Sequence, residues 1–143
     1  MKRQVKTVVS DKIEVNKDKI YRISDPIQLV EIFFPAKNAC NRRAAFLAIF
    51  FEIKNADNQR VESTDYIAGK YGLSQSSIIK ARVKMSRIGL IRKRDGFWIF
   101  STVFGKSLEN LVKKIESYRA PAQSEDLKAR EGIFVELAKG MKG

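Results

Sequence analysis

The sequence predicts a mainly helical fold with a small β-hairpin, which is an α+β class. Two observations carry this prediction. The chain has 143 residues and 44% apolar content, which is enough for one domain with a real core. Residues 66–94 follow a pattern of helix, turn, helix and hairpin, and amphipathic helical segments lie on either side of them.

Positive charge is concentrated in the same central segment. The chain has a net charge of +12, and residues 66–94 contain eight Lys or Arg and no Asp or Glu. These eight are Lys70, Lys80, Arg82, Lys84, Arg87, Arg92, Lys93 and Arg94. Because the charges are interspersed with apolar residues on a folded motif, they predict a polyanionic partner rather than a disordered tail.

Composition excludes several function classes. The single cysteine, Cys40, cannot form an internal disulfide, and the chain contains no histidine, the commonest metal ligand and acid–base group. There is no phosphate-cradling glycine loop and no paired acidic motif. We therefore expect no enzymatic activity, no metal and no cofactor.

The first residues contain no stretch typical of export or membrane insertion. Charged residues interrupt the apolar positions of MKRQVKTVVSDK, and no run of 18 or more apolar residues occurs. We expect a cytoplasmic, nucleoid-associated protein.

The N-terminal third predicts short strands followed by helices. Weak apolar alternation from Val5 to Ile23 predicts one or two strands. Asp25 and Pro26 then predict the start of a helix that ends near Phe34, because aspartate caps helices and proline is tolerated at the first helical position.

The next helix, expected from about residue 38 or 41 to Lys54, is apolar around most of its circumference. Its apolar residues are Phe46, Leu47, Ile49, Phe50, Phe51 and Ile53. Such a helix must be covered on several sides, so it is either the central core helix or part of a dimer interface, and the two roles are compatible.

Two shorter helices follow, joined by a tight turn. Ser63 or Thr64 caps the first, Gly72 ends it, and Ser74 caps the second. On the second helix the apolar positions Ile78, Ala81, Met85 and Ile88 separate from the polar and basic positions Ser76, Ser77, Lys80, Lys84 and Arg87. Ile79 and Val83 form a secondary apolar arc, which we expect to pack against a neighbouring helix; contact with thymine methyl groups is the alternative.

A basic hairpin completes the central segment. In IRKRDGFWIFS, Asp95 and Gly96 are a pair that two-residue hairpin turns prefer. We expect Phe97, Trp98 and Phe100 on the return strand to pack under the hairpin rather than stack on bases.

The last 39 residues predict two more helices, interrupted near Pro121. The first has Leu108, Leu111, Val112, Ile115 and Tyr118 at helical spacing, and the second places Leu127, Phe134, Leu137, Ala138 and Met141 on one side. Their apolar faces need a partner. We favour self-association, and the alternative is that they fold back on the core.

The run from Ile67 to Ile91 resembles the helix-turn-helix of winged-helix transcription regulators of the GntR and MarR type. The matching positions are Ile67, Ala68, Gly72, Leu73, Ser74, Gly89, Leu90 and Ile91, with Ile78, Ala81 and Met85 facing inward. Two positions depart from the pattern: Arg82 replaces a residue that is usually a buried leucine, and Ile88 replaces a polar one.

The resemblance implies a winged helix-turn-helix fold with N-terminal and C-terminal helical extensions. It divides the chain into an extension over residues 1–37, a winged-helix domain over 38–104, and C-terminal helices over 105–143 for dimerisation or core covering. It implies that the recognition helix, begun by Ser74, enters the major groove, with base or near-base contacts from Gln75, Ser76, Ser77 and Lys80. Phosphate contacts are then expected from Lys84, Arg87, Arg92, Lys93 and Arg94.

The favoured function is a homodimeric regulator of transcription that binds double-stranded DNA. A replication-initiation, plasmid-maintenance or chromosome-organising protein would use the same DNA-binding unit. The third possibility, a winged-helix protein-interaction module, fits the acid-free basic segment less well. The sequence does not indicate whether a small-molecule effector binds.

Overall fold

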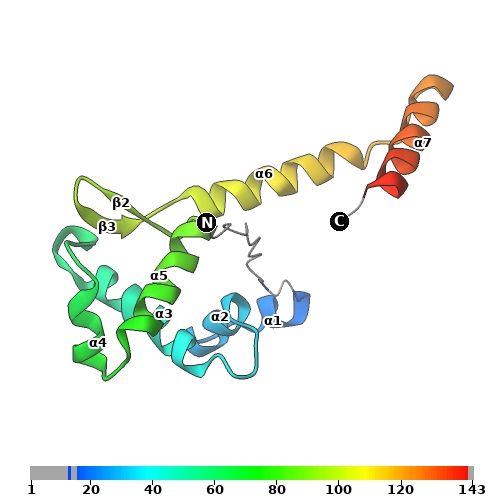
Figure 1. The fold of residues 1–143 in the computed structure, drawn as a ribbon. Coiled ribbons are helices and arrows are strands. Elements are labelled where there is room, and N and C mark those ends of the chain that lie inside the picture. Colours follow the sequence, from blue (N-terminus) through cyan, green and yellow to red (C-terminus); the bar gives the residue numbers. More distant parts are fainter. Residues whose placement is uncertain (1–12, 14–15, 142–143) are drawn as a thin grey trace, which may run out of the picture. The chain divides into compact units, whose positions relative to one another are not determined.

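The computed structural model describes Ile13 and residues 16–141, and shows a mainly helical chain with a small antiparallel sheet (Figure 1). Its elements are α1 (Lys17–Tyr21), α2 (Pro26–Phe33), α3 (Cys40–Asn55), the 3₁₀ turn η1 (Asp57–Gln59), β1 (Arg60–Val61), α4 (Asp65–Tyr71), α5 (Gln75–Ile88), β2 (Ile91–Arg94), β3 (Phe97–Phe100), α6 (Val103–Tyr118) and α7 (Glu125–Gly140). The mainly helical α+β class expected from the sequence is confirmed.

The chain divides into two compact units, Met1–Phe104 and Gly105–Gly143. The division falls where the predicted C-terminal segment begins. Within the first unit, Val30, Phe33 and Phe34 belong to the same buried cluster as residues of α3, α4 and α5, so the described part of the predicted 1–37 extension shares the core with the residues that follow it.

The predicted strands near the N-terminus are wrong where the structure describes them. Residues 17–21 form helix α1, and Ile20 and Tyr21 lie exposed on it. The alternation was too weak and too interrupted by charge to specify a strand. The earlier part of that prediction, from Val5 to Val15, lies outside the described residues apart from Ile13, which belongs to no strand.

Helix α2 begins as predicted. The Asp25 side chain accepts a hydrogen bond from the Gln28 backbone N–H at 2.9 Å, and Pro26 occupies the first turn. Pro35 follows the helix end and redirects the chain into α3.

Helix α3 is the central helix of the first unit. Phe46, Ile49 and Ile53 are fully buried on it, and α2, α4, α5 and the sheet all pack against it. The Phe46 ring stacks on Phe33 at 5.3 Å between centroids, and Phe50 meets Phe100 of the sheet at 5.1 Å. The prediction that this helix is covered on several sides is confirmed.

Helices α4 and α5 meet at a tight turn through Gly72, whose φ of 66° lies in the left-handed region. The Ser74 hydroxyl then accepts the Ser77 backbone N–H at 3.1 Å and caps α5. Ile78, Ala81 and Met85 have no exposed surface, so the predicted core face of α5 is confirmed.

The β2–β3 hairpin turns at Asp95 and Gly96, which both have positive φ, as a primed two-residue turn requires. A third strand was not predicted: Arg60 and Val61 of β1 pair antiparallel with Ile99 and Trp98, so β3 is the centre of the sheet. Trp98 and Phe100 pack against the core as expected, whereas Phe97 lies under the Arg60 guanidinium at 4.4 Å.

Among the described helices, none combines the length and apolar character that crossing a membrane requires.

Gly89, the residue directly after α5, contacts the beginning of α6. Its φ is 89°, and its carbonyl accepts the Phe104 backbone N–H at 3.0 Å. A Cβ at this position would lie 3.0 Å from the Phe104 nitrogen and from Val103 Cγ1. Gly72 has the same left-handed backbone, but a Cβ there would meet nothing within 4 Å.

We therefore predict different costs for two alanine substitutions. Gly72→Ala should destabilise the fold by about 1–2 kcal/mol, the cost of a left-handed alanine. Gly89→Ala should cost about 1–3 kcal/mol more, because its methyl group also collides with packed neighbours. Urea unfolding followed by the fluorescence of Trp98, the single tryptophan, measures both, and equal costs would contradict the close approach at Gly89.

Candidate nucleic-acid interface

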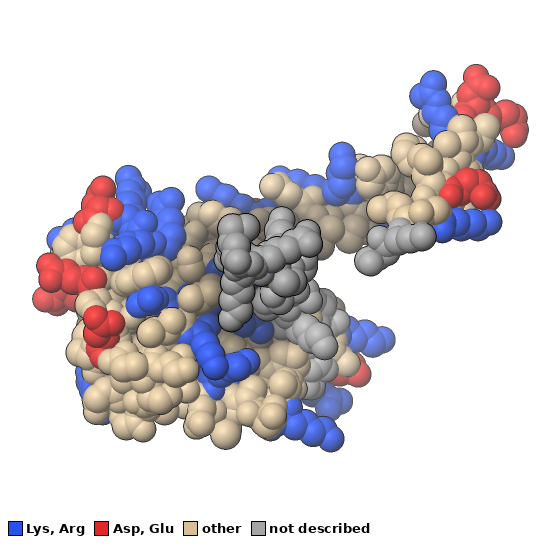
Figure 2. All heavy atoms as spheres, viewed as in Figure 1, with Lys and Arg blue, Asp and Glu red and all other residues tan. Residues whose placement is uncertain are grey.

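The outward face of α5 carries a stripe of polar, basic and apolar side chains. Because Ile78, Ala81 and Met85 point into the core, the opposite side of the helix presents Ser76, Lys80, Val83 and Arg87, all of them exposed. Figure 2 shows Lys and Arg atoms gathered over α5 and over the hairpin on one face of the molecule.

A basic groove runs between this stripe and the first turn of α3. One hollow of about 300 Å³ is lined by Asn38, Asn41 and Arg42 on one side and by Ser76, Ser77 and Lys80 on the other. An adjoining hollow of about 260 Å³ continues along α5 past Ile79, Val83, Lys84 and Arg87. Arg42 and Lys80 line both hollows, and no acidic residue lines either. We call this feature the α3–α5 groove.

Arg42 was missed by sequence reasoning, as were Asn38 and Asn41. The only signal was that the first turn of α3 has no acidic residue, although acids are favoured at helix N-termini. Their approach to α5 spans more than 30 residues of sequence and depends on the packing of α3 against α5.

Ile79 and Val83 are only partly covered by the rest of the protein. They are 43% and 41% exposed, and both line the α3–α5 groove together with Arg42 of α3. Val83 is three residues after Lys80 and four before Arg87, so it lies between the two cations along the helix axis, and a molecule that contacts both cations also comes close to this valine.

Lys84, predicted to contact phosphate, is engaged within the fold. It is half-buried, its ammonium donates a hydrogen bond to the Phe33 carbonyl, and it lies 4.3 Å from the Phe34 ring centroid. These contacts anchor α5 to the end of α2. The structure thus gives Lys84 a packing role in addition to lining the groove.

The first turn of α5 holds the predicted base-contacting residues. Ser77 is half-buried, and its hydroxyl accepts a hydrogen bond from the Ser74 hydroxyl at 2.9 Å. Gln75 is exposed, but its Nε2 donates to the Asp65 carbonyl at 2.6 Å, which ties α5 to α4. Ser76 and Lys80 are the members of this group that face the groove with no such tie among the described contacts.

The three cations of the hairpin are divided between the two faces of the sheet. Lys93 pairs across the strands with Trp98, and its ammonium lies 5.9 Å from that ring. Arg92 and Arg94 alternate to the other face of the sheet, and Arg94 lies 3.8 Å from the exposed carboxylate of Asp95. All three remain exposed.

Arg82 links the hairpin to the helix pair. Its guanidinium donates to the buried Thr64 hydroxyl at 2.8 Å and lies 5.1 Å from the Trp98 ring. Trp98 therefore brings a cation of α5 and a cation of β2 to one ring. Arg82, which departs from the winged-helix pattern, is therefore held by contacts with Thr64 and Trp98.

Lys70 is set apart from the other cations of the segment. It forms an ion pair of 3.0 Å with Glu52 of α3, whose side chain is only 10% exposed, and Tyr71 donates to the same carboxylate at 2.8 Å. Burial acts to raise the pKa of Glu52, but hydrogen bonds from Lys70, Tyr71 and Tyr66 outweigh it and leave that pKa lowered. Burial and Glu52 raise the pKa of Tyr66 to about 12.

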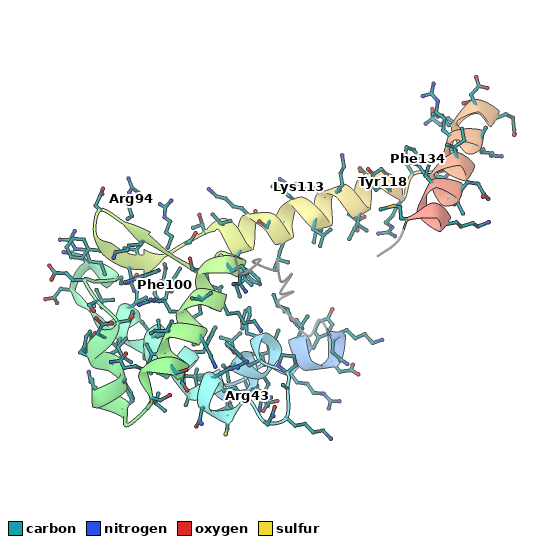
Figure 3. All side chains as sticks on the ribbon, viewed as in Figure 1. Arg43, Arg94, Phe100, Lys113, Tyr118 and Phe134 are labelled. Atoms are coloured by element: carbon teal, nitrogen blue, oxygen red, sulfur yellow. The ribbon has the colours of Figure 1, made fainter. Side chains whose placement is uncertain are left out.

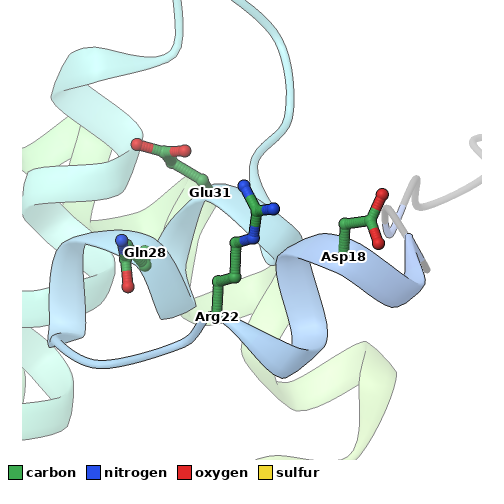
Figure 4. Close-up of a pocket in the computed structure, with 4 residues that line it drawn as sticks. All are labelled: Asp18, Arg22, Gln28 and Glu31. Atoms are coloured by element: carbon green, nitrogen blue, oxygen red, sulfur yellow. The ribbon is translucent and has the colours of Figure 1, made fainter.

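A separate hollow of about 170 Å³ lies between α1 and α2, lined by Asp18, Arg22, Gln28 and Glu31 (Figure 4). Its two carboxylates disfavour a polyanion. The Gln28 amide oxygen already accepts the Ser24 backbone N–H at 2.7 Å. The α3–α5 groove is the better candidate site.

Comparisons with known proteins add no family to these observations. No protein-family model matches the chain, and neither the curated proteins nor the solved structures include a match. Function is therefore inferred from the residues and geometry of the groove and the hairpin.

The Glu52 cluster predicts how stability depends on pH. A lowered carboxyl pKa stabilises the fold above its ordinary value of 4.5 and ceases to do so as pH falls through the lower folded value. The raised Tyr66 pKa stabilises below 10.0, and this stabilisation disappears as pH rises toward 12. Urea unfolding across both ranges should show Glu52→Gln flattening the acid dependence and Tyr66→Phe reducing the alkaline dependence. An unchanged profile in Glu52→Gln would show that other groups dominate.

Proposed function

We propose that this protein binds double-stranded DNA as a winged helix-turn-helix protein, with α5 as the recognition helix in the major groove. The observation that carries the proposal is the α3–α5 groove, in which Arg42 of α3 and Lys80 of the exposed α5 stripe line both hollows, and no acidic residue lines either. A cationic, acid-free surface on an outward-facing helix is complementary to the charge of the DNA backbone.

Dimensions support this placement. An α-helix with its side chains is about 10–12 Å across, and the major groove is about 12 Å wide. Helix α5 has its core residues on one side only, so its opposite side is available along the stripe from Ser76 to Arg87. The β2–β3 hairpin then contacts the DNA backbone or the minor groove.

The residues divide into two roles under this proposal. Ser76 and Lys80 reach base edges, since hydroxyl and ammonium groups hydrogen-bond to them in the major groove. Arg42, Arg87, Arg92 and Lys93 contact phosphates and fix the register. Ser74, Ser77 and Gln75 hold the start of α5 in place, and the amide oxygen of Gln75 remains suited to accept a hydrogen bond from a base.

We further propose that the C-terminal unit makes the protein a homodimer. Of residues 105–141, all are exposed except Ala122, which is half-buried, and the apolar side chains include Tyr118 and Phe134 (Figure 3). Two helices that bury so little are not stable alone in water. Their formal charge is +2, from eight basic and six acidic residues, against +10 for residues 1–104, so two copies of this unit repel each other little.

A dimeric DNA-binding protein of this kind acts most simply as a transcription regulator that occupies its site. Two-fold symmetry places two recognition helices in successive major grooves, which matches a palindromic site. Selection of bound fragments from a random duplex pool tests this role. A palindromic motif bound about a thousandfold more tightly than random DNA supports a regulator, and a flat profile supports an architectural protein instead.

The salt dependence of duplex binding tests the DNA proposal. Removing a side chain that contacts one phosphate should reduce the slope of log affinity against log salt by about 0.9. We predict this reduction for Arg42→Ala and for Arg92→Ala. Lys70→Gln is the matched control, since it also removes one positive charge but from the ion pair with Glu52. Salt-independent binding, or none, would refute the proposal.

Sizing of the protein in solution tests the dimer. We predict that the full chain is a dimer and that a chain ending at Phe104 is a monomer. Ile115→Glu should also give a monomer, because it puts a charge into the apolar stripe of α6. Asn110→Glu adds the same charge on the opposite side of that helix and should leave the dimer intact. A full chain that elutes as a monomer would contradict the assignment.

A further inference from the structure

We infer that Ile79 and Val83 read thymine methyl groups, so that the α3–α5 groove prefers duplexes with thymine facing the middle of α5. This inference rests on the proposed DNA binding and names the feature of the bases that the apolar part of the groove recognises.

Ile79 and Val83 lie together on the outward side of α5. Both are about two-fifths exposed, and both line a groove whose other lining residues include Arg42, Lys80, Lys84 and Arg87. Phe34 also lines this hollow, so an apolar patch is bordered by cations. Such a surface fits a ligand that presents negative charge at its edges and an apolar group between them.

The major groove of DNA has this chemistry. Base edges there present hydrogen-bond donors and acceptors, and the C5 methyl of thymine is the apolar group among them. Phosphates flank these edges on both strands. A duplex containing thymine therefore supplies both components.

The spacing of the two side chains also matches stacked base pairs. Residues four apart on a helix have Cβ atoms about 5–6 Å apart, and base pairs are stacked about 3.4 Å apart. Ile79 and Val83 thus span one or two base-pair steps. Two thymines at that separation, on either strand, meet both side chains.

The test compares a short alternating dA·dT duplex with the same duplex in which uracil replaces thymine and so removes only the methyl group. For the wild-type chain we expect binding to weaken about fourfold for each recognised methyl that is removed, the effect of burying one methyl-sized group. In Val83→Ala and Ile79→Ala this thymine-to-uracil ratio should shrink toward one. Ile27→Ala removes an exposed isoleucine from α2, outside the groove, and should leave the ratio unchanged.

The outcomes separate the two proposals. Equal affinity for the thymine and uracil duplexes, with steep salt dependence retained, overturns methyl readout and leaves DNA binding standing. Absence of salt-dependent binding overturns both. Thermal unfolding of the alanine variants provides a further check, because a large fall in melting temperature would show that the pair is covered by protein rather than open to DNA.

Discussion

The packing of α3 against α5 determines the orientation of the proposed site. Phe46, Ile49 and Ile53 of α3 and Ile78, Ala81 and Met85 of α5 are almost fully buried in one cluster. Removing this apolar surface from water stabilises the fold, and it fixes the rotation of α5 about its own axis. Since the helix has one apolar side, its opposite side must face outward. The same contact brings the first turn of α3, with Arg42, to the edge of α5 and so creates the groove.

Polar contacts around this core engage three cations of the basic segment within the fold. Lys70 is paired with Glu52, Arg82 is held by Thr64 and Trp98, and Lys84 is bound to the end of α2. These three hold α4, the hairpin and α2 to their neighbours. Lys84 lines the groove as well, and the groove lining gains one further cation, Arg42, from outside the basic segment.

Local patterns predicted the elements whose ends and faces are set by nearby residues. Asp25 and Ser74 cap their helices, Asp95 and Gly96 form the hairpin turn, and the inward side of α5 follows its helical spacing. Local patterns could not predict contacts between residues that are far apart in the sequence. The two-residue strand β1 exists because β3 offers it a paired edge, and the Glu52–Lys70 pair joins residues 18 apart. Arg42 reaches the site only through tertiary packing.

Cys40 lies exposed at the first position of α3, next to Asn41 and Arg42 of the groove lining. It is the single thiol of the chain. A maleimide dye or a nitroxide attached there would sit beside the groove without any substitution in the protein. The natural chain therefore carries its own attachment point for a spectroscopic reporter of groove occupancy, with no second thiol to give a competing signal.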